Sequence, residues 1–334
     1  METDVSSLFV TDTIVISFIL VEKPIIKFFI LFFIFFLFEC STAFGWIYLQ
    51  EAVTIGGIKQ WISIKGADEK KPVLLFLHGG PGNSVMGYDE KFTKTLQKHF
   101  LVIQWDQRDV ERTAKLNASD KPLTVQLIED DAVELINYLR KRFSQNKVYL
   151  VGVSWGGFLG LKIANDYPDL LEAYFAVSPM IWQDESDRLS LAWATGRASA
   201  KGNKVELEEL SKVNVPFKTV EDVYYHRKWV VAEMGSKSAS RGFVEHWSEK
   251  WLTLALEAAH VNFFEVAPEI KCPVYFLVGD RDYQTYFKLT ADYVKVLKAE
   301  KKELFWFTNT GHNIPTARPE KFQQIIIAHR NSTN

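Results

Sequence analysis

The pentapeptide Gly152-Val153-Ser154-Trp155-Gly156 decides the fold of this chain. An apolar run at residues 148–151 precedes it, and an apolar stretch with helical spacing at residues 158–167 follows it. Strand, sharp turn and helix in this order are typical of a nucleophile elbow, in which the turn raises a serine above the edge of a sheet. The turn is tight and strained, so it needs glycine two residues before and two residues after the serine. We therefore predict that Ser154 is a nucleophile at the carboxyl end of a strand.

Strand and helix patterns alternate along the rest of the chain. Residues 46–55 and 58–64 alternate apolar and polar side chains around Gly56-Gly57, which predicts an antiparallel hairpin at one edge of the sheet. Continuous apolar runs predict parallel strands that are covered on both faces, at residues 73–77, 101–105, 148–151, 173–177 and 274–278. A further strand is expected at residues 304–307, and helices at residues 88–99, 123–142, 158–167, 286–298 and 319–329. This order predicts a doubly wound, mostly parallel α/β sheet.

Residues 180–268 break this alternation with charged, tryptophan-containing helical segments. Because the strand pattern resumes near Cys272, we interpret the stretch as a helical lid inserted over the strand ends. The predicted organisation is a leader or anchor at residues 1–43, a first part of the α/β core at 44–179, the lid at 180–268 and a second part of the core at 269–334.

The amino terminus is predicted to be a signal peptide or a membrane anchor. Residues 28–38 are an unbroken apolar run between two lysines and Ser41-Thr42-Ala43, which favours cleavage near Ala43. Alternatively, residues 14–21 and 25–38 form an anchor interrupted by Glu22-Lys23-Pro24. The protein is therefore expected to be exported, to the periplasm or the medium, or to be held at a membrane through residues 14–38. After cleavage near Ala43, Cys272 would be the single cysteine, so no internal disulfide is expected.

Composition limits the possible partners. The 334 residues are 47% hydrophobic, which is enough for a full core, and the net charge is -2 with both signs interspersed. No basic face is expected, so nucleic acid is excluded as a partner. The oligomeric state is not indicated.

A serine nucleophile needs a base, and the base needs a third group to orient it. In this type of fold the acid and then the histidine follow the serine. Gly279-Asp280-Arg281-Asp282 follows one predicted strand, and Gly311-His312 follows the next. We predict His312 as the base and Asp282 as the acid, because Asp282 has room to turn back towards the histidine. Asp280 remains the alternative acid, although it is better placed to cap the loop or to pair with Arg281.

The segment His78-Gly79-Gly80-Pro81-Gly82 leaves the strand at residues 73–77 with a bare backbone. A tetrahedral intermediate needs fixed donors for its oxyanion, which are usually backbone N–H groups. We expect one donor from Gly80, with Gly79 as the alternative, and the other from Trp155.

Together these motifs resemble the α/β hydrolases of the prolyl iminopeptidase type. The resemblance rests on residues 78–82, on Trp105-Asp106-Gln107-Arg108, on the serine pentapeptide and on the loops of Asp282 and His312, and it extends from about Trp46 to the end. It implies the α/β hydrolase fold and a serine peptidase that removes an amino-terminal residue, often proline, from short peptides. It also implies that neither a metal nor an organic cofactor is needed.

Two segments depart from the family pattern. The family continues after the arginine as Gly-x-Gly-x-Ser, whereas this chain has Asp109-Val110-Glu111-Arg112-Thr113, so the loop must change shape or be strained. The family's lid also carries tryptophans next to a glutamate that holds the substrate's ammonium group. In this chain, Trp247-Ser248-Glu249-Lys250-Trp251 resembles that pattern only loosely. Other lid acids that could hold an amine are Asp184, Glu185, Glu206 and Glu233.

The leading hypothesis is therefore a cofactor-independent serine hydrolase, an aminopeptidase that acts on small peptides. A carboxylesterase that acts on small acyl esters is the alternative, because the acyl-enzyme chemistry is shared. A third reading is a non-catalytic binding protein anchored in the cell envelope, which only the altered loop at residues 109–113 favours.

Overall fold

A computed structural model describes residues 45–117 and 121–330 of the chain. The predicted leader or anchor at residues 1–43 lies outside the described residues and stays a prediction. Among the helices of the described ranges, none is long and apolar enough to cross a membrane.

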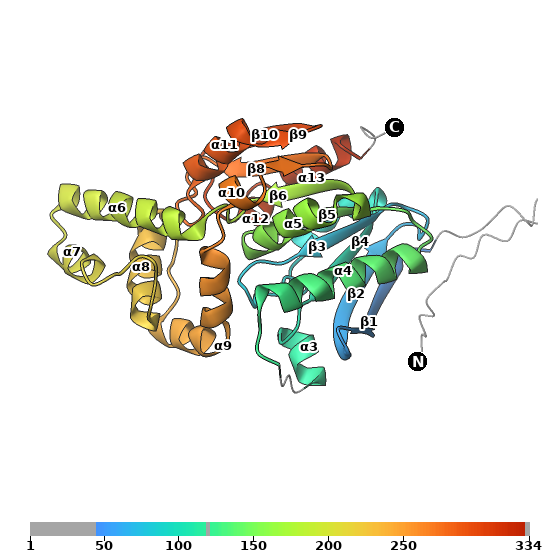
Figure 1. Ribbon diagram of the computed structural model, residues 1–334, viewed down its shortest axis with the longest axis horizontal. Helices are drawn as coiled ribbons and strands as arrows, with labels where there is room; N and C mark the ends of the chain where they lie inside the picture. The colour runs from blue at the N-terminus through green and yellow to red at the C-terminus, as the bar shows by residue number, and fades with distance from the viewer. Residues whose placement is uncertain (1–44, 118–120, 331–334) are drawn as a thin grey trace, which may run out of the picture. The chain divides into compact units, whose positions relative to one another are not determined.

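An eight-stranded sheet forms the centre of the described chain, in the order β1-β2-β4-β3-β5-β6-β8-β10 (Figure 1). The strands β1 (Ile47–Ile55) and β2 (Ile58–Gly66) form the predicted antiparallel hairpin at one edge, joined by Gly56 and Gly57, both with positive φ. A two-residue turn of this kind matches the twist of the strands that it joins. β2 is antiparallel to β4, and all later pairs in the order are parallel. The mostly parallel α/β sheet is thus confirmed.

The predicted strands are confirmed, with ends that differ by at most two residues. They are β3 (Val73–Leu77), β4 (Leu101–Asp106), β5 (Val148–Val153), β6 (Leu171–Val177), β8 (Val274–Gly279) and β10 (Lys302–Phe307). Burial on both faces explains their continuous apolar runs. In β3, for example, Leu75 and Leu77 face one core cluster while Leu74 and Phe76 face the other.

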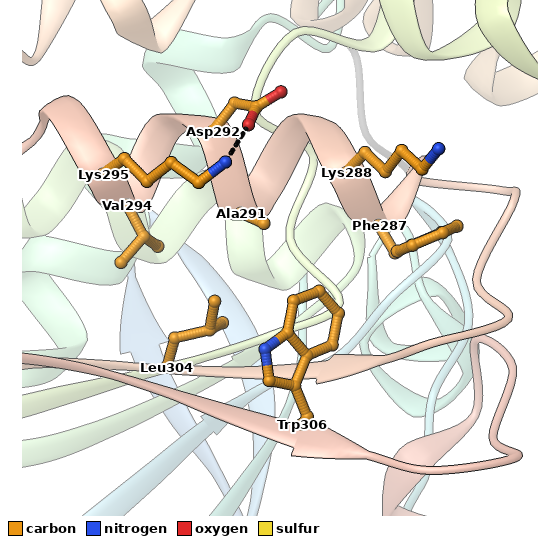
Figure 2. Close-up of a pocket in the computed structure, with 8 residues that line it drawn as sticks. All are labelled: Phe287, Lys288, Ala291, Asp292, Val294, Lys295, Leu304 and Trp306. Carbon is orange, nitrogen blue, oxygen red and sulfur yellow. Dashed lines mark hydrogen bonds and ion pairs between the residues drawn. The ribbon is translucent and has the colours of Figure 1, made fainter.

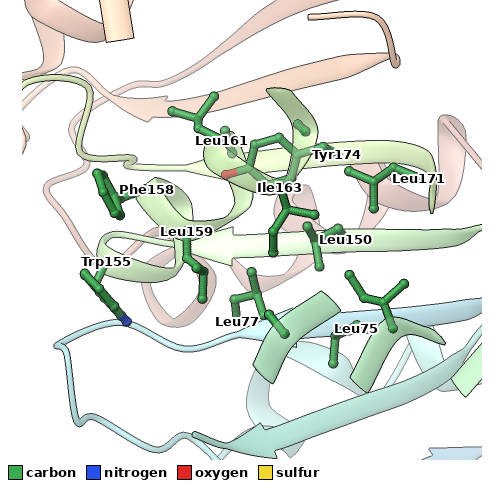
Figure 3. Packing of buried hydrophobic residues seen from close by; sticks show 14 of the residues in the cluster. Leu75, Leu77, Leu150, Trp155, Phe158, Leu159, Leu161, Ile163, Leu171 and Tyr174 are labelled. Carbon is green, nitrogen blue, oxygen red and sulfur yellow. The ribbon is translucent and has the colours of Figure 1, made fainter. Parts of the chain in front are cut away.

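Helices cover both faces of the sheet. The helices α4 (Val125–Arg142) and α5 (Trp155–Asp166) pack on one face, where Figure 3 shows Leu159 of α5 beside Leu77. The other face is covered by α2 (Glu90–Thr93) and α13 (Pro319–Ala328). α11 (Phe287–Val296) lies beside β8 and β10.

The helix expected at residues 88–99 is wrong, because the segment divides into α2 and a 3-10 turn at Leu96–Lys98. A side chain from a distant part of the chain explains the break. Gln323 Oε1, on α13, accepts hydrogen bonds from the backbone N–H groups of Thr95 at 2.7 Å and Leu96 at 3.4 Å. These donors therefore bond to α13 rather than to the preceding turn.

Several short elements have no counterpart among the predicted ones. They are α3 (Glu111–Leu116), α12 (Ile314–Ala317) and a separate pair of two-residue strands, β7 (Glu269–Ile270) and β9 (Lys298–Ala299). Each is too short to give a periodic pattern in the sequence.

Residues 180–268, which we call the insertion, contain helices and no strand. Its helices are α6 (Gln183–Lys201), α7 (Lys204–Leu210), α8 (Val220–Glu233), α9 (Arg241–Ala259) and α10 (Phe263–Val266). Pro216 and Gly235 lie in the breaks on either side of α8. Figure 1 shows α7 at the end of the insertion away from the sheet, and α9 beside the core.

Candidate active site

Ser154 lies between β5 and α5 with φ 56° and ψ -114°, a strained conformation for a residue with a side chain. A Cβ on Gly152 would lie 2.1 Å from the carbonyl oxygen of Gly156. A Cβ on Gly156 would lie 2.0 Å from the carbonyl oxygen of Leu77. Neither position tolerates a side chain, which is the physical reason for both glycines of the pentapeptide.

The structure brings His312 and Asp282 together. His312 Nδ1 lies 2.8 Å from Asp282 Oδ2, and the Asp282 side chain is buried. Burial alone would raise the pKa of Asp282, but the imidazole of His312 and hydrogen bonds to the carboxylate hold this pKa below its ordinary value. Among these bonds are donations from the backbone N–H and the hydroxyl of Thr285, at 3.2 and 2.9 Å. The pair can therefore act as an anchored imidazole beside an ionised carboxylate.

Asp280, the alternative acid, has a different partner. Its Oδ1 accepts a hydrogen bond from the backbone N–H of Thr310 at 3.2 Å. Arg281 donates to Asn309 Oδ1 at 2.5 Å rather than pairing with Asp280. Asp280 thus ties its own loop to the loop that carries His312.

The end of β6 joins the three loops of the candidate site. The carbonyl oxygen of Val177 accepts a hydrogen bond from the backbone N–H of Ser154 at 3.0 Å. The next residue, Ser178, donates through its hydroxyl to the carbonyl oxygen of His312 at 3.1 Å. Its own carbonyl oxygen lies 3.1 Å from Oγ1 of Thr285. The serine, acid and histidine loops therefore meet at the carboxyl ends of neighbouring parallel strands.

The glycine-rich segment at residues 78–82 lies beside the serine. A Cβ on Gly79 would lie 3.4 Å from Cβ of Ser154, and Gly80 has φ 118°. On the other side, Trp155 is the first residue of α5, where a backbone N–H lacks a partner within the helix. Ser154 thus lies between the glycine-rich segment and the amino terminus of α5.

The loop at residues 109–113 keeps a left-handed backbone without glycine. Asp109 has φ 63° and Glu111 has φ 37°. The Thr113 hydroxyl donates to the carbonyl oxygen of Asp106 at 2.6 Å and accepts from the backbone N–H of Trp61 at 2.8 Å. The positive φ values of Asp109 and Glu111 are strained backbone for residues with side chains, which is one of the two outcomes expected from the sequence.

Helix α9 of the insertion contacts the glycine-rich segment, which the sequence did not predict. Trp247 Nε1 donates to the carbonyl oxygen of Pro81 at 2.9 Å. A Cβ on Gly82 would lie 2.5 Å from the indole of Trp251, and Lys250 Nζ donates to the carbonyl oxygen of Asp109 at 2.8 Å. The spacing of the two tryptophans and the lysine on one helix was the available signal, but their partners lie far away in the sequence.

Two other features of the described chain add nothing to the candidate site. Within residues 45–117 and 121–330, no three His, Cys, Asp or Glu side chains are grouped as metal ligands would be. A hollow of about 470 Å³ between α11 and β10 is lined mostly by apolar side chains, with Leu304 and Trp306 pointing towards α11 (Figure 2). None of the predicted site residues lines this hollow.

Comparisons with known proteins agree with the fold. A family model described as the α/β hydrolase fold matches residues 72–214. A probable aminopeptidase of Bacillus subtilis is 27% identical over 85% of this chain and 96% of its own length. A proline iminopeptidase of Clostridioides difficile is 25% identical over 83% of this chain and 96% of its own. The crystal structure of a proline iminopeptidase from Mycobacterium smegmatis superposes with a TM-score of 0.59 at 17% identity, covering 85% of this chain and 98% of the other.

Proposed function

The chain is an α/β hydrolase similar to the prolyl iminopeptidases, and from this premise we propose that it is a serine aminopeptidase that releases the amino-terminal residue of short peptides. The observation that carries the proposal is the pair of His312 Nδ1 and Asp282 Oδ2, 2.8 Å apart, at the sheet edge where the elbow presents Ser154. The full-length similarity to a probable aminopeptidase favours a peptide substrate over an ester.

In the proposed reaction, the Ser154 hydroxyl attacks the carbonyl carbon of the first peptide bond and passes its proton to Nε2 of His312. Asp282 holds the imidazole with its proton on Nδ1 and stabilises the imidazolium that forms. The oxyanion accepts hydrogen bonds from the backbone N–H of Trp155 and from Gly80, or Gly79 as the alternative. His312 returns the proton to the leaving amine as the C–N bond breaks, and water then releases the residue from Ser154.

An aminopeptidase must also recognise a free amine. Glu249 of the Trp247–Trp251 segment is exposed and lies 3.4 Å from Nδ1 of His246, and the insertion offers four further candidate carboxylates. Three of them already have cationic or histidine partners: Asp184 with His260, Glu185 with Arg188, and Glu233 with Arg197 and Lys201. The fourth, Glu206, accepts from Asn203 at 2.9 Å, while its buried Oε1 has no partner among the described residues.

Burial and the neighbouring Glu233 raise the pKa of Glu206, so an added cation would stabilise its ionised form. We therefore select Glu206 as the carboxylate to test for amine recognition. Because α7 lies at the outer end of the insertion (Figure 1), this role would require the insertion to close over the strand ends.

The test of the function is a comparison of substrates. Wild-type protein should hydrolyse aminoacyl anilides with a free amine, proline and alanine among them, faster than their N-acetylated forms. Ser154→Ala should abolish both this activity and labelling by a fluorophosphonate probe. Hydrolysis of acyl esters alone would replace the proposal with the esterase alternative, and an unlabelled wild type would exclude a serine hydrolase.

A second comparison tests the amine site. Glu206→Gln should raise KM for free-amine anilides about tenfold while leaving ester hydrolysis and fluorophosphonate labelling unchanged. Equal kinetics for Glu206→Gln and wild type would assign amine recognition to another group.

A further inference from the structure

Gln107 is the member of the Trp105-Asp106-Gln107-Arg108 segment that contacts both sides of the candidate oxyanion site. Two other members of the segment serve the core: Trp105 Nε1 donates to Gln60, and Arg108 forms two hydrogen bonds with Asp131, each 2.9 Å. The fourth member, Asp106, accepts a hydrogen bond from the hydroxyl of Ser84. Gln107 is also buried, but its contacts lie on the loops around Ser154.

On one side, Gln107 holds the residue that follows the nucleophile. Its Oε1 accepts a hydrogen bond from Nε1 of the Trp155 indole at 3.0 Å, and Trp155 is fully buried. The indole also stacks on Phe158, with ring centroids 5.5 Å apart. The first turn of α5, which supplies one proposed oxyanion donor, is therefore fixed through its side chain.

On the other side, Gln107 holds the glycine-rich segment through His78. The backbone N–H of Gln107 donates to His78 Nε2 at 3.4 Å, and His78 Nδ1 lies 2.9 Å from the carbonyl oxygen of Gly79. Both contacts are satisfied when the ring is neutral with its proton on Nδ1. Burial lowers the pKa of His78 and so favours this neutral form.

We propose that Gln107 is a positioning residue that fixes the distance between the two oxyanion donors, Trp155 on α5 and Gly80 or Gly79 on the glycine-rich segment. This inference rests on the proposed function. Two donors on separate loops stabilise an oxyanion only when both lie about 3 Å from it, and displacements near 1 Å lower rates by about 100-fold. Gln107 bonds to both loops and touches neither the substrate nor Ser154 in the proposed reaction.

The burial of the amide supports a role beyond packing. Gln107 Nε2 is buried without a hydrogen-bond partner among the described residues. Leaving such a group unpaired costs about 1 to 3 kcal/mol, which an apolar side chain of similar size would avoid. We therefore attribute the presence of glutamine at position 107 to its acceptor atom, Oε1.

Two variants test the link from either end. Gln107→Met keeps the length of the side chain but removes the acceptor, and Trp155→Phe removes the indole donor while leaving Gln107 in place. Each should lower kcat for an anilide or ester substrate by roughly 10- to 100-fold, with KM changed less than threefold. Affinity for a boronate transition-state analogue should fall by the same factor as kcat.

Because both variants break one contact, the double variant should lose little more than either single variant. The matched control is Gln60→Met, which removes the acceptor of another buried indole, that of Trp105, at a hydrogen bond of 2.8 Å. Gln60 contacts none of the loops around Ser154 among its described hydrogen bonds, so kcat per folded molecule should stay within twofold.

The outcomes separate this inference from the proposed function. The positioning role is overturned if the wild type is active and folded Gln107→Met has the same kcat and the same affinity for the analogue. Additive losses of kcat in the double variant also overturn it. A wild type that neither hydrolyses the substrates nor reacts with a fluorophosphonate contradicts the proposed function instead. If Gln107→Met does not fold, the kcat and analogue affinity of Trp155→Phe decide the question, because that variant removes the same hydrogen bond.

Discussion

The α/β core and the insertion are stabilised in different ways. Every residue of β3, β4 and β8 is buried, and two large apolar clusters cover the two faces of the sheet. The insertion adds two small clusters, centred on Ala194, Ala198, Leu210 and Val230 and on Phe217, Val223 and Val244. Its helix α9 also enters a large cluster of the core, through Trp251, Leu254 and Ala258. Its interior also contains a polar group around Asp187, which accepts from Gln183 at 2.8 Å and pairs with Arg227 at 3.0 Å.

The contacts between the insertion and the core determine how the insertion is placed. Apolar packing of Trp251, Leu254 and Ala258 attaches α9 to the core. Directional contacts attach α6. Gln183 Nε2 donates to the carbonyl oxygen of Gln284 at 2.8 Å, and Trp193 stacks on Tyr283 with ring centroids 3.6 Å apart. Both partners follow Asp282 directly, so the insertion docks on the loop of the proposed acid.

The largest expected effect is on the catalytic chemistry that we assign to the core. Asp282→Asn should lower kcat by about 10⁴-fold, because asparagine cannot stabilise the imidazolium of His312. Asp280→Asn is the matched control, since its side-chain oxygen can still accept from Thr310, and kcat should change less than threefold. Steady-state kinetics decide this. Equal losses in the two variants would contradict the assignment of the acid.

The next largest effect breaks the junction between the two regions. Gly82→Ala places a Cβ 2.5 Å from the Trp251 indole at a residue with φ 89°, so the free energy of unfolding should fall by about 2 to 4 kcal/mol. It should also lower kcat/KM, because α9 must move away from the glycine-rich segment.

Gly57→Ala is the control for this junction variant. Gly57 has φ 77°, but a Cβ there would meet nothing within 4 Å. Only backbone strain of about 1 kcal/mol is expected, with unchanged activity. Urea unfolding and kinetics of both variants measure the difference. Similar results for Gly82→Ala and Gly57→Ala would show that α9 does not constrain the segment.

A smaller effect concerns a buried carboxylate in the core. Burial raises the pKa of Glu129 to about 7, against the opposing charge of Lys162 at 3.3 Å. Because the pKa of Glu129 is higher in the folded than in the unfolded chain, its protonated carboxyl group contributes to the free energy of unfolding. This contribution is fully present below about pH 4.5, declines as pH rises and is lost above about pH 7. Glu129→Gln cannot ionise, so at pH 8 it should be more stable than wild type by about 1 to 3 kcal/mol, with the difference gone at pH 4.

The matched variant in the insertion is Asp187→Asn. Burial raises the pKa of Asp187 to about 6, opposed by Arg227, so the same decline should occur between about pH 4 and 6. Urea unfolding at several pH values would compare the two regions. A difference between variant and wild type that does not change with pH would refute either assignment.

The smallest effect tests the strained loop beside α9. Glu111→Gly removes a side chain at φ 37°, but it also makes the unfolded chain more flexible. The relief of backbone strain exceeds this entropic cost, so the free energy of unfolding should rise by about 0.5 to 1 kcal/mol. This corresponds to a rise in Tm of about 1 to 4 °C. A calorimetric scan measures this change, and a lower Tm would show that the loop is relaxed in spite of its φ.

Local patterns predicted most of the core. Apolar runs located the strands because a parallel strand buried on both faces leaves no position for a polar side chain, as in β3. The pentapeptide located the elbow because steric clashes allow only glycine at residues 152 and 156. The helix expected at residues 88–99 failed because its break depends on Gln323, more than 200 residues away.

The sequence by itself determined the α/β fold, the strained turn at Ser154 and the candidate loops of Asp282 and His312, because short-range periodicity and steric exclusion act within a few residues. Only the tertiary structure decided that Asp282 rather than Asp280 meets His312, that Gln107 bonds to both proposed oxyanion loops and that α9 docks on the glycine-rich segment. These are contacts between side chains and backbone groups from distant segments, and their distances depend on how the sheet brings those segments together.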